Sequence, residues 1–193
     1  ATSAATTVTV NALPVAAVNS ETICAGDPAV TFIATSATAV GWSWSENGTG
    51  TLQNTSGTIA GNYTVVVTDA NGCESAPATG VLTVNALPAA PTITAGGPTT
   101  LCDGESVVLT SSEATGNVWS TAETTQAITV ATTGSYTVEY TDGNGCKATS
   151  AATTVTVNAL PVAAVNSETI CAGDPAVTFI ATSATAVGWS WSE

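Results

Sequence analysis

Hydrophobic and polar residues alternate along short segments of this chain. In one such segment the apolar residues Tyr136, Val138 and Tyr140 are separated by threonine and glutamate. A period of two is that of a β-strand with one buried face, and no segment shows the 3.6-residue period of an amphipathic helix. The sequences Asp-Ala-Asn-Gly at 69–72 and Asp-Gly-Asn-Gly at 142–145 are turn signals, because Asn and Gly accept positive φ. Short strands with turn signals every ~8–12 residues predict an all-β sandwich fold.

The chain also contains an identical repeat. Residues 148–193 reproduce residues 1–46 without a change, at an offset of 147 positions (148 − 1 = 147). The tetrapeptide Asn-Ala-Leu-Pro begins at Asn11, Asn85 and Asn158, so its spacings are 74 and 73. Each 147-residue unit therefore holds two related modules, which we name A and B. Tandem arrays usually build length rather than catalytic chemistry, so a stalk or filament is the first expectation.

These spacings divide the chain into four segments. We predict the last strand of a preceding B module at 1–10, module A at 11–84, module B at 85–157 and the first half of a further A module at 158–193. The chain is then a window of a longer array. The Asn-Ala-Leu-Pro junction is short and stiff, since proline fixes its own φ and restricts the residue before it. Consecutive modules are therefore expected to form an extended rod.

Composition narrows the function classes. The formal net charge is −13, and Lys147 is the single basic residue. A nucleic-acid-binding protein needs a basic surface, which this sequence lacks, and no apolar run approaches the ~20 residues of a membrane span. The chain has no histidine, so Ser-His-Asp catalysis is excluded, and no enzyme or cofactor is expected. Ca²⁺ between modules is conceivable for so acidic a chain, although no dense acidic cluster occurs.

Residues 134–138, Gly-Ser-Tyr-Thr-Val, resemble the sixth strand of immunoglobulin-like domains. In those domains a tyrosine near the start of this strand forms the tyrosine corner, two residues before an inter-sheet cysteine. The resemblance implies three pairs of core residues: the corner tyrosines Tyr63 and Tyr136, Val65 and Val138 at the usual cysteine position, and Trp42 and Trp119 as the core tryptophans of the third strand. The expected fold is therefore a series of immunoglobulin-like β-sandwiches without the usual central disulfide.

The modules are more specifically similar to immunoglobulin-like repeats of giant surface proteins in Bacteroidota-type bacteria. That pattern resembles C-x-G-x-S-V-x-L, then W-S, then T-G-S-Y-T-V-x-x-T-D-x-N-G-C, and module B carries nearly all of it. Module A departs from it between Trp44 and Tyr63, where it is four residues longer, with 31 positions from Trp42 to Cys73 against 27 from Trp119 to Cys146. The resemblance implies an extracellular stalk of a secreted adhesin, a group that includes gliding-motility adhesins exported by the type IX secretion pathway.

The five cysteines are Cys24, Cys73, Cys102, Cys146 and Cys171. Modules A and B hold two each, at spacings of 49 and 44, which do not fit C-x-x-C metal sites. Thiol catalysis would need a neighbouring base, and the chain has no histidine to supply one. Disulfides formed in an oxidising, extracellular setting are the best interpretation.

Two disulfide patterns remain open. Pairing within modules would join Cys24 to Cys73 and Cys102 to Cys146. Under the immunoglobulin topology that the resemblance implies, however, these partners lie at opposite ends of a strand of about seven residues, or ~23 Å. A disulfide tolerates Cα separations of only ~4.4–6.8 Å. The alternative is a bridge between consecutive modules, of which Cys24–Cys146 is the one complete within this sequence.

Two further functions stay open. Trp42 and Trp44 share a strand face, and paired tryptophans can stack on sugars, although Trp44 can equally cover the mouth of a sandwich whose core holds Trp42. Trp44 is therefore the candidate contact for a glycan- or surface-binding adhesive module. The other alternative is a filament of short subunits joined by strand donation from residues 1–10. Expected partners are adjacent modules, like filaments, and glycans or surfaces bound by a tip, with neither nucleic acid nor membrane insertion.

Overall fold

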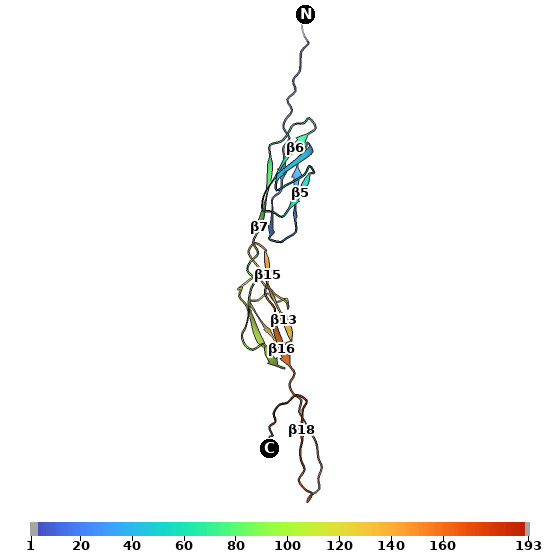
Figure 1. Cartoon of the computed structure of the whole chain (residues 1–193), viewed down its shortest axis with the longest axis vertical. Coiled ribbons are helices and arrows are strands. Elements are labelled where there is room, and N and C mark those ends of the chain that lie inside the picture. Colours follow the sequence, from blue (N-terminus) through green and yellow to red (C-terminus); the bar gives the residue numbers. More distant parts are fainter. Residues whose placement is uncertain (1–3, 192–193) are drawn as a thin grey trace. The chain divides into compact units, whose positions relative to one another are not determined.

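A computed structural model describes residues 4–191 (Figure 1). The ends of two predicted segments, residues 1–3 of the first and 192–193 of the last, lie outside the described residues. The described chain consists of β-strands, turns and extended segments and contains no helix. It divides into two compact units, Ala1–Ala89 with Thr141–Ala148, and Ala90–Tyr140 with Thr149–Glu193. The predicted all-β fold is confirmed.

The first unit contains a seven-stranded sandwich. Its strands are β1 (Ala17–Val18), β2 (Glu21–Cys24), β3 (Val30–Thr35), β4 (Ala39–Glu46), β5 (Asn54–Gly57), β6 (Gly61–Asp69) and β7 (Ala78–Asn85). One sheet has the order β1-β3-β5, and the other has the order β2-β7-β6-β4. All pairs are antiparallel except β2 and β7, which run parallel. Two sheets with these crossovers give the immunoglobulin-like arrangement.

The core of this sandwich comes from the inward positions of both sheets. Its buried members are Ile23, Phe32, Ala34, Trp44, Tyr63, Val65, Val67 and Leu82. The Phe32 ring stacks on the Tyr63 ring at a centroid distance of 4.0 Å. Along β6, every second residue from Tyr63 to Asp69 is buried, as a strand with one inward face requires.

The strands of residues 93–158 repeat the arrangement at shorter length, and residues 141–148 among them belong to the first compact unit. These are β8 (Ile93–Ala95), β9 (Thr100–Cys102), β10 (Val107–Ser111), β11 (Asn117–Trp119), β12 (Ala127–Val130), β13 (Gly134–Tyr136), β14 (Val138–Thr141), β15 (Lys147–Thr149) and β16 (Thr153–Asn158). The sheet orders are β12-β10-β8, β11-β14-β15 and β13-β16-β9. Strands β9 and β16 pair in parallel, as β2 and β7 do in the first unit. The core consists of Leu101, Val107, Leu109, Trp119, Ile128, Val130, Tyr136, Val138 and Val155.

Both corner tyrosines have the same hydrogen bond. The Tyr63 hydroxyl donates to the carbonyl oxygen of Ile59 at 3.1 Å, and the Tyr136 hydroxyl donates to that of Thr132 at 2.9 Å. The acceptor is four residues upstream in each case, which is the geometry of a tyrosine corner. A Cβ added to Gly57 would overlap the Tyr63 hydroxyl, so this glycine makes room for the ring.

The core tryptophan of the first sandwich is Trp44, so its prediction as a surface contact is wrong. Trp44 is 7% exposed, lies opposite Val65, and donates from Nε1 to the Leu52 carbonyl at 2.9 Å. Trp119 lies opposite Val138 and donates from Nε1 to the Thr125 carbonyl at 2.8 Å. These two tryptophans are therefore the equivalent pair.

Trp42 is half-buried and packs against the same core from two positions earlier on β4. Trp42 follows Phe32 by 10 positions (42 − 32), as Trp119 follows Leu109 (119 − 109), and on this spacing the two tryptophans look equivalent. Strand pairing, however, places Trp42 opposite Val67. The four extra residues that module A has over module B in this region therefore lie on both sides of Trp44. Two lie before Trp44 (44 − 32 = 12 against 119 − 109 = 10), and two follow it (63 − 44 = 19 against 136 − 119 = 17).

Identical sequences adopt different structures in the two copies of the repeat. In the copy at 158–191, only β17 (Ala164–Val165) and β18 (Ala181–Thr182) form, in the register of β1 and β3. Phe179 is 52% exposed, whereas its counterpart Phe32 is fully buried. In the first copy, β2 and β4 are hydrogen-bonded to β7 and β6.

Candidate functional site

The loop after β2 holds Cys24 in a fixed backbone conformation. The Cys24 amide donates to Asp27 Oδ2 at 2.8 Å, and the Asp27 amide donates back to the Cys24 carbonyl at 3.0 Å. Gly26, between them, has a φ of 93°, which an L side chain rarely adopts. The sequence Cys-Ala-Gly-Asp thus closes a tight loop with the cysteine at its start.

The turn before β15 holds Cys146 in a different way. Asp142 Oδ1 accepts hydrogen bonds from the amides of Asn144 and Cys146, each at 2.9 Å. The Asp142 amide donates to the Cys146 carbonyl at 2.9 Å, which closes the turn. Gly145 has a φ of 83°, so the Asp-Gly-Asn-Gly sequence supplies the required positive φ.

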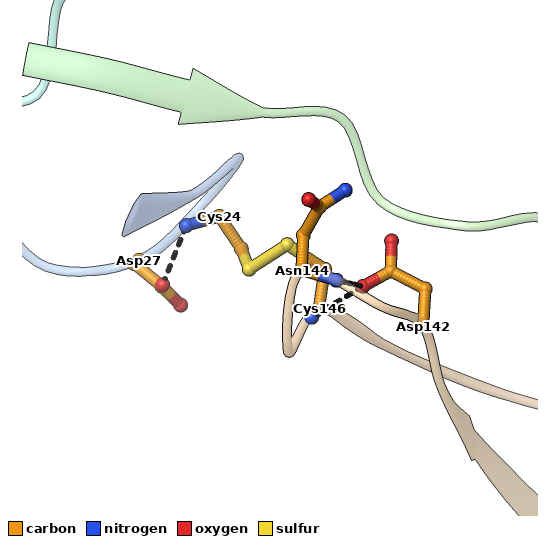
Figure 2. The surroundings of a disulfide bond; sticks show 5 residues. All are labelled: Cys24, Asp27, Asp142, Asn144 and Cys146. Carbon is orange, nitrogen blue, oxygen red and sulfur yellow. Dashed lines mark hydrogen bonds between the residues drawn. A yellow bond between two sulfur atoms is a disulfide. The ribbon is translucent and has the colours of Figure 1, made fainter. Parts of the chain in front are cut away.

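These two elements are joined by a disulfide between Cys24 and Cys146 (Figure 2). The Cα atoms lie 5.6 Å apart, within the usual range for a disulfide, and the cysteines are 122 positions apart in the sequence. Residues 141–148 belong to the same compact unit as residues 1–89. Of the two patterns left open by the sequence, the structure contains the bridge between a module A cysteine and a module B cysteine, and neither within-module pair.

The other three cysteines are free thiols. Cys102 and Cys171 are exposed, Cys73 is half-exposed, and Cys146 within the disulfide is 1% exposed. Cys102 and Cys171 begin loops like that of Cys24. Their amides donate to Glu105 Oε2 at 2.8 Å and to Asp174 Oδ2 at 2.7 Å, respectively.

Cys73 ends a turn like that of Cys146. Its amide donates to Asp69 Oδ1 at 2.9 Å, and the Asp69 amide donates to the Cys73 carbonyl at 3.0 Å. The hydrogen bond from the Cys73 amide, together with those from Asn71 and Gly72, lowers the pKa of Asp69 below its ordinary value against the opposing effect of burial. The carboxylate is therefore held in its charged form by the turn it closes.

Each loop cysteine lies beside the point at which the chain leaves its module. Cys24 is in register with Asn85 across β2 and β7, and Cys102 is in register with Asn158 across β9 and β16. Both asparagines open the Asn-Ala-Leu-Pro sequence that leads to the next module. The parallel pairing of the second and last strands therefore puts this cysteine next to the junction.

The acidic partners of the loop cysteines were the part of this site that sequence reasoning missed. The turn sequences alone do not link Asp27 or Glu105 to a cysteine amide. The signal was present as the recurring Cys-x-Gly-Asp or Cys-x-Gly-Glu spacing at 24–27 and 102–105. In each loop the acid is three residues after the cysteine.

The described residues contain no cluster of three or more histidine, cysteine or acidic side chains that could hold a metal ion. They also include no helix long and apolar enough to cross a membrane.

Comparison with known proteins gives structural similarities alone. Neither the protein-family models nor the curated proteins contain a match to this chain. Among similar solved structures, murine CEACAM1b has 13% identity and a TM-score of 0.37 over 75% of this chain and 100% of its own. An I-band fragment of titin has 15% identity and a TM-score of 0.36, over 79% and 68%. The fibronectin(III)-like modules of Clostridium thermocellum CbhA have 14% identity and a TM-score of 0.33, over 74% and 95%. At these scores the similarities carry no argument about function.

Proposed function

We propose that this chain is part of an extracellular structural stalk or filament made of tandem immunoglobulin-like modules. Module A spans 11–84 and module B spans 85–157, and the pair forms the repeating unit of 147 residues. The role is mechanical: each module supplies length, and each junction limits the angle between neighbours. No catalytic activity is part of this proposal.

The observation that carries the proposal is the Cys24–Cys146 bridge. A disulfide within a module would strengthen that module, whereas this one ties residues of two consecutive modules across a junction that already contains proline. Removing freedom at the junction serves a structure that has to hold its length. A stable disulfide also favours an oxidising location outside the cell.

The resemblance of the repeats to those of Bacteroidota-type surface proteins supports a finer version of this role. In that version the chain belongs to the stalk of a giant adhesin, of the kind exported by the type IX pathway and used in gliding motility. The exposed, acidic surface favours solubility and keeps neighbouring stalks apart. The glycan-binding alternative loses its candidate residue, because Trp44 lies in the core.

The strand-donation alternative concerns residues 4–10. Val8 is 82% exposed, whereas Val155, at the same position of the identical segment in β16, is fully buried. This segment therefore fits the last strand of a B module, either earlier in the same polypeptide or in another subunit. The mass of the native polypeptide on a reducing, denaturing gel separates the two, because a stalk requires a very long chain and donation requires a small subunit.

Small-angle scattering of the 193-residue protein, with and without reductant, tests the stalk proposal. We expect the oxidised protein to scatter as an elongated particle with the cross-section of one sandwich. Reduction should broaden its distance distribution because the junction gains freedom. A compact globular profile, or the profile of a flexible coil in the oxidised protein, would contradict the proposal.

A further inference from the structure

The three free thiols belong to two structural classes. Cys102 and Cys171 begin Cys-x-Gly-acid loops, and Cys73 ends an Asp-x-Asn-Gly-Cys turn. We call the first class loop cysteines and the second class turn cysteines. The bonded pair contains one member of each class, since Cys24 is a loop cysteine and Cys146 is a turn cysteine.

We propose that every free cysteine of this chain is half of such a loop-to-turn disulfide with another copy of the repeat. Cys102 and Cys171 each bond the turn cysteine of a following module, and Cys73 bonds the loop cysteine of a preceding module. The partner is thus a second copy of this chain's own repeat, in the same polypeptide or in another. This inference rests on the proposed stalk function in that the array must continue beyond a single unit.

The free loops match the bonded loop in backbone geometry. The amide of residue i + 3 donates to the cysteine carbonyl at 3.0 Å for Cys24, 3.0 Å for Cys102 and 3.1 Å for Cys171. The glycine between has a φ of 93°, 92° and 102° at Gly26, Gly104 and Gly173. The three loops therefore present their cysteine from the same local fold, although one of the three is already bonded.

The free turn matches the bonded turn as closely. The Cys73 and Cys146 amides each donate to the Oδ1 atom of an aspartate four residues earlier at 2.9 Å. Gly72 and Gly145 have φ values of 79° and 83°, and each amide donates to that aspartate's carbonyl at 3.1 Å. A Cys73 turn can thus take the place that the Cys146 turn occupies in the known bridge.

The strand register determines which modules are joined. Cys102 lies opposite Asn158, where the chain leaves module B, as Cys24 lies opposite Asn85, where it leaves module A. A loop cysteine therefore lies beside the point where the chain continues into the module that follows. Cys73 follows β6, which carries Tyr63, and Cys146 follows β14, which begins two residues after Tyr136. The rule that links Cys24 forward to Cys146 then links Cys102 forward to a turn of the Cys73 kind.

The bond formation is an ordinary thiol oxidation. Two thiols lose two protons and two electrons as one S–S bond forms, and a small-molecule disulfide such as oxidised glutathione accepts them and is reduced to two thiols. The step consists of two thiol–disulfide exchanges through a mixed disulfide. It needs no metal or catalytic base from this chain.

Two complementary variants of the 193-residue protein test whether loop cysteines bond turn cysteines. Cys73→Ser keeps the loop thiols alone, whereas the double variant Cys102→Ser/Cys171→Ser keeps the turn thiol alone. Both retain the Cys24–Cys146 bridge, which peptide mapping verifies in each. The proteins are incubated in a glutathione redox buffer at millimolar concentration, separately and mixed, and are then alkylated and separated on a non-reducing gel.

We expect each variant alone to remain monomeric and the mixture to form disulfide-linked species. Mass spectrometry should find Cys73 bonded to Cys102, whereas Cys171, the copy of Cys24, pairs by the same rule with a turn of the Cys146 kind, which is already bonded in both variants. Homodimers as abundant as mixed species, or no mixed disulfide under conditions that preserve Cys24–Cys146, would overturn the inference. Such a failure with elongated scattering retained would leave the stalk function in place, whereas a compact scattering profile would reject the stalk function independently.

Discussion

Trp44 lies opposite Val65 across strands β4 and β6, and this pair forms the centre of the first sandwich. Trp44 is 7% exposed, Val65 is fully buried, and the indole nitrogen of Trp44 is bonded to the Leu52 carbonyl. Trp42, two residues earlier, points to the same side but packs at the margin of the core. The two tryptophans therefore differ in the stability that they supply.

Trp44→Ala should lower the free energy of unfolding of the first sandwich by about 3–5 kcal/mol, the usual range for a buried aromatic residue replaced by alanine. Trp42→Ala is the matched control and should cost less, because its side chain is half-buried. Urea unfolding followed by circular dichroism measures both. A larger loss of stability for Trp42→Ala than for Trp44→Ala would contradict the assignment of Trp44 as the core tryptophan.

The tyrosine corners predict a smaller effect. Tyr63→Phe and Tyr136→Phe each remove a hydroxyl donor from a backbone carbonyl and should cost about 1 kcal/mol, the net value of a typical hydrogen bond. Tyr140→Phe, which alters a half-buried tyrosine outside the corner, is the control and should change stability less. Thermal unfolding of the three variants provides the comparison. Equal melting temperatures for the three variants and the parent protein would show that the tyrosine-corner hydrogen bonds do not stabilise the fold.

The Cys24–Cys146 disulfide predicts a difference between two cysteine-to-serine variants at equivalent positions. Cys24→Ser opens a loop that spans 122 positions and should lower stability by up to about 4 kcal/mol through the greater entropy of the unfolded chain. Cys102→Ser changes an exposed free thiol in a similar loop and should leave stability of the 193-residue protein unchanged. Denaturant titrations without reductant measure both, and a loss shared by the two variants would contradict the assignment.

The lowered pKa of Asp69 predicts a dependence on acid. Because its folded-state pKa lies below the ordinary value of 3.8, Asp69 stabilises the fold above that pH, and the contribution disappears as pH falls through the folded-state pKa. The difference in unfolding free energy between the parent protein and Asp69→Asn should therefore be constant near neutral pH and shrink below about pH 4. If the difference in unfolding free energy between the parent protein and Asp69→Asn grew on acidification, it would contradict a lowered folded-state pKa of Asp69.

Alternation and turn signals were sufficient to predict the fold class. The alternating residues of β6 and the Asp-x-Asn-Gly turns required no tertiary information, because a strand with one buried face has a period of two. The equivalence of Trp44 and Trp119 was not accessible in the same way. Counting positions from Phe32 treats loop residues and strand residues alike, whereas pairing with Val65 depends on where the intervening turn lies.

The second copy of the repeat shows a further limit of local sequence. Residues 21–24 form β2 beside β7, but the identical residues 168–171 form no strand. A residue pattern can predict that a segment is able to pair, but its partner strand decides whether it does. The disulfide pairing also depends on tertiary structure. The spacing of the cysteines left two pairings open, and the register of Cys24 with Asn85 puts Cys24 beside the junction that the bridge crosses.

The disulfide map of the native protein tests the central claim most directly. The protein is purified from its source under acidic, thiol-blocking conditions, digested without reduction and analysed by mass spectrometry. We predict that the peptide containing Cys24 is linked to the one containing Cys146, so that consecutive modules are joined across their junction. Recovery of Cys24 linked to Cys73, with Cys102 linked to Cys146, would place the bridges within modules and contradict a stalk whose junctions are held by disulfides.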